Sequence, residues 1–181
     1  MKKIVLTLIL SACGFVLATA QGKPSFGLKA GLNFVQFDAR DDVEVDNNSG
    51  FHAGIVLHVP LIKKSGLQFE ALYSVESSDD IDLNFINVPI LYTHKLLPGL
   101  RLQVGPQFKI STKSEFKDEV VAATFEEDFK SFNFDLSAGL EYKLPAIGVF
   151  AQARYNYGLT EFEENFELKS NTFQLSVGYR F

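Results

Sequence analysis

The sequence contains no tryptophan, and its only cysteine is Cys13, near the start of the chain. Beyond residue 20, no stretch approaches the roughly 20 consecutive apolar residues that a membrane-spanning helix requires. Basic residues are in deficit, with 17 lysines and arginines against 22 aspartates and glutamates, and the formal charge is −5. A net acidic chain argues against nucleic acid as a partner. An exported form of this chain is therefore either soluble or spans a membrane with strands.

The first 20 residues have the features of a secretory signal peptide. Two lysines follow Met1, apolar residues continue to Ala20, and the small residues of Ala18-Thr19-Ala20 form a cleavage site. We therefore expect a signal peptide over residues 1–20 and a mature domain over 21–181, without thiol chemistry because Cys13 leaves with the signal. A membrane-anchoring helix is the weaker alternative because the apolar run is short and interrupted by Gly14. A lipoprotein is also weaker, since apolar residues continue past Cys13.

Apolar and polar residues alternate in about eight stretches. In the last one, apolar or aromatic side chains occupy every odd position from Phe173 to Phe181, and mostly polar ones the even positions. Strand side chains alternate faces with a period of two, so each stretch predicts a strand with one apolar and one polar face. The expected strands cover residues 26–37, 51–59, 67–76, 83–95, 100–111, 132–144, 149–159 and 172–181.

The connections between these strands alternate in length. Those over 60–66 and 96–99 and around Pro145 are short and carry proline, as turns do. Four longer connections, over 38–49, 77–82, 112–130 and 160–170, contain eighteen of the 22 acidic residues. Short turns at one end and long loops at the other are typical of an outer-membrane barrel.

Charged residues within the strands keep to the polar face, as expected if the other face meets lipid, where a lysine or arginine at mid-depth costs about 2–4 kcal/mol. An eight-stranded barrel has an interior just wide enough for side chains to fill. We therefore predict an all-β fold, an eight-stranded antiparallel up-and-down transmembrane barrel, with its lumen plugged by a network of charges. The residues of this predicted network are Lys29, Glu70, Glu76, Lys95, Arg101, Lys109, Asp135, Glu141, Lys143, Arg154 and Arg180.

Two details of the strands need an explanation. Pro89 and Pro106 lie inside strands, where each removes a ladder hydrogen bond, so we expect β-bulges there. Without tryptophan, an interfacial aromatic belt must consist of phenylalanine and tyrosine. The candidates are Phe37, Phe51, Tyr92, Tyr142, Tyr157 and Phe181.

The segments FGLKAGLNF, LNFINVPILYTHKL, GLRLQVGPQF and the ending LSVGYRF resemble the PorT-type outer-membrane β-barrel family of Gram-negative bacteria. The resemblance covers essentially the whole mature chain and implies an eight-stranded barrel surrounded by outer-membrane lipid. Leu175, Val177, Tyr179 and Phe181 are similar to the terminal sorting signal that the barrel-assembly machinery reads. That machinery is therefore an expected partner.

Catalytic and metal sites find little support. His52 and His58 share a strand face about 20 Å apart, too far to bind one metal ion, and His94 is expected near the periplasmic rim. A lipid hydrolase would need a serine–histidine or histidine–carboxylate pair that faces lipid, whereas His52 and His58 face inward. No phosphate loop, zinc motif or nucleophile elbow is present. We expect no enzymatic activity, no metal and no cofactor.

The acidic connections offer the one candidate binding region. Asp41, Asp42, Glu44 and Asp46 could bind divalent cations, an extracellular ligand or a protein. Ordinary solvated loops are the favoured interpretation, because none matches a defined calcium-binding template. The leading functional hypothesis is a non-enzymatic barrel with a structural or adhesive role, or one that binds through its loops. The alternatives are a narrow channel for small solutes and a soluble periplasmic barrel that binds a ligand with its faces reversed.

Overall fold

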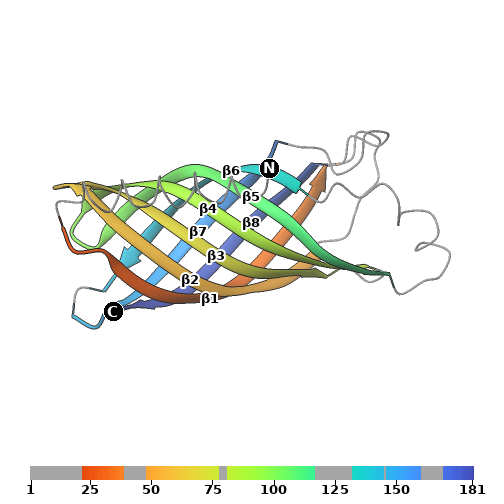
Figure 1. Cartoon of the computed structure of the whole chain (residues 1–181), viewed down its shortest axis with the longest axis horizontal. Coiled ribbons are helices and arrows are strands. Elements are labelled where there is room, and N and C mark those ends of the chain that lie inside the picture. Colours follow the sequence, from red (N-terminus) through yellow and green to blue (C-terminus); the bar gives the residue numbers. More distant parts are fainter. Residues whose placement is uncertain (1–21, 39–47, 78–80, 117–131, 145, 160–168) are drawn as a thin grey trace, which may run out of the picture.

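The computed structural model describes residues 22–38, 48–77, 81–116, 132–144, 146–159 and 169–181. Eight strands form one closed barrel in which every neighbouring pair is antiparallel and β8 pairs with β1 (Figure 1). This arrangement confirms the predicted fold. The strands are β1 Ser25–Asp38, β2 Asn48–Ile62, β3 Ser65–Ser77, β4 Ile81–Leu97, β5 Leu100–Phe116, β6 Phe132–Lys143, β7 Val149–Gly158 and β8 Lys169–Arg180. The described part of the chain contains no helix that is long and apolar enough to cross a bilayer.

The apolar face of the strands points outward. On β1 and β8, Phe26 is 61% exposed and Val177 is 64% exposed, whereas Lys29 and Arg180 on the opposite parity are buried. The same division of apolar outside and polar inside recurs on the other strands. The soluble-barrel alternative, which needs the aromatic rings inside and the charges outside, is therefore wrong.

The parity rule has exceptions at inward positions. Val35, Val56, Leu72, Phe85, Leu91 and Phe150 are buried among the polar residues of the lumen. Val59, which the alternation assigned to the outer face of β2, is also buried. It lies beside Pro60, which the segment before β1 contacts at Gly22.

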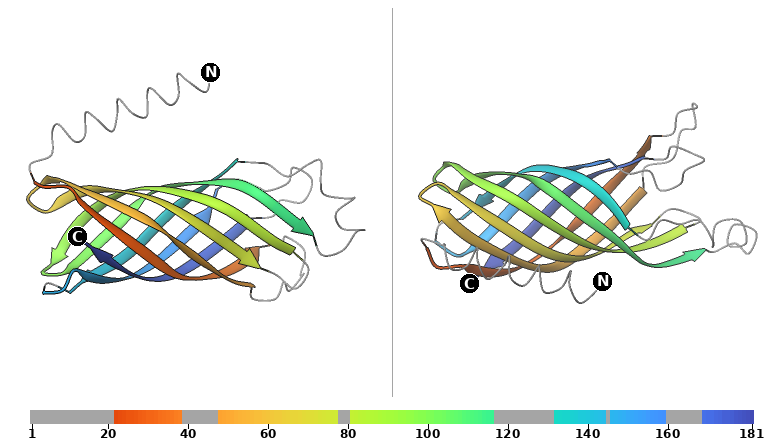
Figure 2. Two further views of the ribbon diagram at one scale, coloured as in Figure 1. Left: turned by 60° about the horizontal axis from the view of Figure 1, so that its bottom comes forward. Right: turned by 45° about the horizontal axis from the view of Figure 1, so that its top comes forward.

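The two ends of the barrel differ. Figures 1 and 2 show the short turns together at one end, where the carboxyl terminus also lies. We call this the turn end and the opposite one the loop end. Gly99 and Gly148 lie in turns with φ of 84° and 74°, a left-handed conformation that glycine adopts without strain. The predicted signal peptide and the acidic residues Asp41, Asp42, Glu44 and Asp46 lie outside the described residues.

The predicted bulges at Pro89 and Pro106 are wrong. The β4–β5 ladder pairs Pro89 with Gln107 and resumes at Tyr92 with Val104 in the same register. The missing hydrogen bonds are therefore accommodated by a local gap in the ladder, without an extra residue. The register shifts of β4–β5 lie elsewhere, between Asn84 and Phe85 and between Lys95 and Leu97.

Candidate functional site

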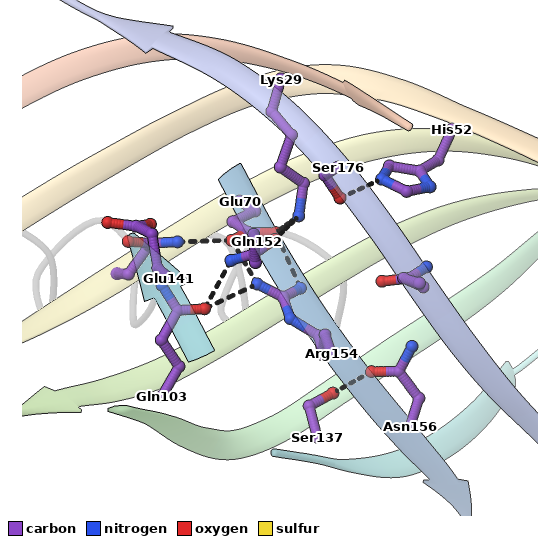
Figure 3. Close-up of polar contacts among 12 residues, drawn as sticks. Lys29, His52, Glu70, Gln103, Ser137, Glu141, Gln152, Arg154, Asn156 and Ser176 are labelled. Atoms are coloured by element: carbon purple, nitrogen blue, oxygen red, sulfur yellow. Dashed lines mark hydrogen bonds and ion pairs between the residues drawn. The ribbon is translucent and has the colours of Figure 1, made fainter. Parts of the chain in front are cut away.

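The centre of the lumen contains a buried carboxylate held by two cations. Glu70 on β3 accepts a hydrogen bond of 2.7 Å from Lys29 Nζ on β1. It also accepts two from Arg154 on β7, of 2.9 Å from Nη1 and 2.6 Å from Nη2. All three side chains are completely buried. Figure 3 shows the three meeting across the lumen from strands that are not neighbours. We call these residues the Glu70 triad.

A second carboxylate lies nearer the turn end. Glu141 on β6 accepts hydrogen bonds of 2.8 and 2.6 Å from the two terminal nitrogens of Arg180 on β8. Gln103 Nε2 on β5 donates a third, of 2.9 Å. Arg101 Nη1 lies 3.6 Å from Glu141 Oε1, and the Arg101 side chain as a whole is partly exposed. Parallel arginine–carboxylate bonds of this kind fix geometry as well as contributing energy.

Glutamines join the two carboxylates into one network. Gln68 Nε2 donates to Glu70 (2.6 Å), and Gln68 Oε1 accepts from Arg180 (2.6 Å). Gln152 accepts from Lys29 (2.7 Å) and donates to Gln103, which also accepts from Arg154 (3.2 Å). The glutamine amide oxygens thus act as additional hydrogen-bond acceptors for Lys29, Arg154 and Arg180, beside the two carboxylates. A continuous path of hydrogen bonds therefore crosses the lumen from β1 through β3, β5, β6, β7 and β8.

A neutral cluster occupies the lumen on the loop side of the Glu70 triad. His52 Nδ1 lies 2.7 Å from Asn33 Oδ1, and His52 Nε2 lies 2.8 Å from Ser176 Oγ. Because an amide oxygen only accepts, Nδ1 carries the proton and Nε2 accepts from the serine hydroxyl. Asn33 also donates to Ser74 (2.7 Å) and accepts from Gln174 (3.0 Å). His52, Asn33 and Ser176 are buried, so the serine–histidine contact links strands and has no exposed nucleophile.

Close backbone approach makes room for His52. A Cβ atom on Gly31 would overlap the carbonyl oxygen of Leu175 and lie 2.8 Å from His52 Cε1. The lack of a side chain at position 31 therefore lets the imidazole reach Ser176 where β1 pairs with β8.

A third group of contacts lies further toward the loop end. Lys109 on β5 lies 3.7 Å from Asp135 on β6 and 5.3 Å from the centre of the Phe85 ring. At the other end of the lumen, the Arg180 guanidinium lies 4.8 Å from the centre of the Phe150 ring. These inward aromatic rings contact cations directly and replace water beside them.

The sequence-predicted residues divide into those that meet in the lumen and those that do not. The structure brings together Lys29, Glu70, Arg101, Glu141, Arg154 and Arg180, and separately Lys109 with Asp135. Lys95 is exposed at the turn end because β4 reaches the barrel mouth there, so its assignment to the lumen network is wrong. Lys143 is only partly buried at the same end. The Glu76 side chain lies outside the described part of the chain.

Sequence reasoning missed the connecting role of the glutamines. Gln68 and Gln152 stand two residues from Glu70 and Arg154 on the same strand face, which is the signal that indicates their place. Among the described residues, no group of three histidines, cysteines or carboxylates could bind a metal ion. The alternate residues Leu175, Val177, Tyr179 and Phe181 are exposed on the outer face, and their role in assembly stays a prediction.

Several solved structures are similar in fold to this chain. Ail, the attachment invasion locus protein of Yersinia pestis, is 17% identical with a TM-score of 0.53, over 88% of this chain and all of that one. Neisserial surface protein A is 13% identical with a TM-score of 0.58, over 88% and 100%. A de novo designed transmembrane β-barrel is 14% identical with a TM-score of 0.56, over 90% and 99%. At these identities, the likeness concerns the fold alone.

No curated protein matches the sequence. A family model does match, over residues 5–181, and its description is outer membrane protein beta-barrel domain. The match covers nearly the entire sequence, and it agrees with the closed barrel and the outward apolar face. The chain therefore belongs to the outer membrane protein beta-barrel domain family and is a protein of the outer membrane.

Proposed function

We propose that this protein is a non-enzymatic outer-membrane barrel whose lumen is plugged, and that it acts through its loops as a structural or adhesive protein. One observation carries the proposal: the network of buried ion pairs and amides that crosses the lumen. A solute passing through would have to separate Arg154 from Glu70 and Arg180 from Glu141. Removing a partner from a buried pair leaves an unpaired charge, which costs about 3–5 kcal/mol.

The composition of the loops indicates which partner they would bind. Fifteen of the 22 acidic residues lie in the four connections between strands at the loop end, over 39–47, 78–80, 117–131 and 159–168, with Asp41, Asp42, Glu44 and Asp46 among them. Such connections repel anions and attract cations. Ail has been solved with a sulfated heparin analogue. For this chain we instead propose a partner with a cationic surface, or divalent cations at the acidic residues. The finer family assignment we propose is the PorT-type group, on the segments quoted above.

Conductance in planar bilayers tests the plug. The purified wild-type barrel should give no current steps above the background of protein-free bilayers. Regular steps that scale with salt concentration would favour the narrow channel instead.

Binding to a cationic partner tests the adhesive role. Polylysine-coated beads should retain vesicles that contain the wild-type barrel better than vesicles with the charge-removal variant D41N/D42N/E44Q/D46N. Equal retention of the two would argue against loop binding without affecting the plug.

A further inference from the structure

Basic residues gather at the turn end of the barrel. Two of them, Lys63 and Lys64, form the turn between β2 and β3, and the others lie at the ends of strands or just before β1. This end contains the short turns and the carboxyl terminus in Figure 1. We call the set the basic rim, and it consists of Lys23, Lys63, Lys64, Lys95, Arg101 and Lys143.

Much of the basic rim is contiguous. The backbone N–H of Lys95 donates to the carbonyl of Lys64 (2.7 Å), and Lys95 is the cross-strand partner of Arg101. The N–H of Lys143 donates to Gly99 (2.8 Å), in the turn between β4 and β5. The side chains of Lys63, Lys64 and Lys95 are exposed. Neighbouring like charges repel one another, so a bound anion would stabilise this arrangement.

The described residues at this end include too few acidic side chains to neutralise the rim. Within the described stretches 22–26, 59–68, 92–102, 141–144, 146–150 and 178–181, the only acidic residue is Glu141. Its carboxylate is completely buried and bonded to Arg180 and Gln103, and it lies 3.6 Å from Arg101, the one member of the rim with which it forms a described ion pair. The barrel is therefore strongly basic at its turn end, in contrast to the acidic connections at its loop end.

Exposed apolar residues accompany the rim. Ile62 precedes Lys63, Leu96 and Leu97 follow Lys95, and Ile147 lies in the turn between β6 and β7; all four side chains are exposed. If this barrel were a soluble protein, these four apolar side chains would be exposed to water. At a bilayer surface they can enter the edge of the hydrocarbon while the lysines extend to the headgroups. In outer-membrane barrels, the short turns lie on the periplasmic side.

We propose that the basic rim binds the phosphates of anionic phospholipid headgroups in the periplasmic leaflet. Basic residues beside an apolar segment attract anionic lipids, and this attraction falls off within a Debye length. The rim thereby fixes the depth of the barrel and enriches anionic lipid around its turn end. The proposal concerns the outer surface and does not depend on whether the lumen conducts.

Electron paramagnetic resonance with spin-labelled lipids tests this proposal. The full barrel is reconstituted in phosphatidylcholine vesicles that contain traces of labelled phosphatidylglycerol or labelled phosphatidylcholine. The motionally restricted fraction of each label reports its association with the protein. At low salt, we expect the wild type to prefer phosphatidylglycerol by about threefold. That preference should fall in K63Q/K64Q, and it should approach one in 1 M salt, where the Debye length is about 3 Å.

A matched variant removes the same charge at the other end. K113Q/K169Q lies at the loop ends of β5 and β8 and should keep the wild-type preference. Equal association of the two lipids with the wild type overturns the proposal, as does an equal loss of preference in K113Q/K169Q. The wild-type salt titration needs no variant, so it decides the question even if K63Q/K64Q fails to fold.

Discussion

Glu70 is the single residue on which the central network depends most. Its carboxylate lies between Lys29 and Arg154, and all three side chains are completely buried. Glu70→Ala leaves both cations without their carboxylate, so we expect a loss of about 3–5 kcal/mol in the free energy of unfolding. Urea unfolding of the barrel in lipid vesicles measures this change.

The apolar variant K29M/E70L/R154M is the control for Glu70→Ala. This variant replaces the carboxylate and its two cations together, so no member of the triad is left as an unpaired buried charge. It should therefore lose less stability than the single substitution. A Glu70→Ala barrel within 1 kcal/mol of the wild type would contradict the importance of the triad.

Leu136 and Ser137 are neighbours on β6 with opposite surroundings. Leu136 is 46% exposed on the outer face, whereas Ser137 is buried and donates to Asn156 (2.6 Å). Leu136→Arg places a charge in lipid and should destabilise the barrel by about 2–4 kcal/mol. Leu136→Ala, which is apolar, should cost less. Recovery of each folded form as the heat-modifiable band on a gel provides the measurement, and equal recovery of Leu136→Arg and wild type would refute the orientation.

At the scale of the strands, the seam between β1 and β8 depends on Gly31. A methyl group there would overlap the Leu175 carbonyl and crowd His52. We expect Gly31→Ala to destabilise the closed barrel by about 1–3 kcal/mol, as overpacking does. Ala30→Val, one residue away but exposed outward, should have little effect. Thermal unfolding in detergent compares the two, and equal midpoints would contradict the close packing of this seam.

The alternation of side chains predicted the strands because successive residues of a strand point to opposite faces, and in this barrel the outer face is apolar and the inner face is mostly polar. It placed Lys29, Glu70 and Arg154 in one predicted network of lumen charges without indicating which members pair, since contacts across the lumen depend on strand tilt and register. The exposure of Lys95 at the mouth depends on where β4 ends, and strand ends are weakly encoded in sequence. Phe85 and Phe150 carry no polar signal, yet both face inward against cations.

For the whole molecule, charge is distributed in three zones. Acidic residues predominate in the connections at the loop end, paired charges fill the lumen, and basic residues surround the turn end. Because side chains occupy the centre of the lumen, we propose the outer surface and the connections as the regions where partners bind.

We expect lipid to surround the apolar face of the barrel and side chains, not water, to fill its lumen. A spin-label scan of single cysteines over residues 134–142 of β6, in vesicles and without residues 1–20, tests both parts together. We predict that even positions are accessible to oxygen, which concentrates in lipid. Odd positions should be protected from oxygen and from a water-soluble nickel chelate. Nickel access at Ser137 and Gly139 would show an open, water-filled lumen, and protection of Leu136 and Leu140 from oxygen would reverse the faces.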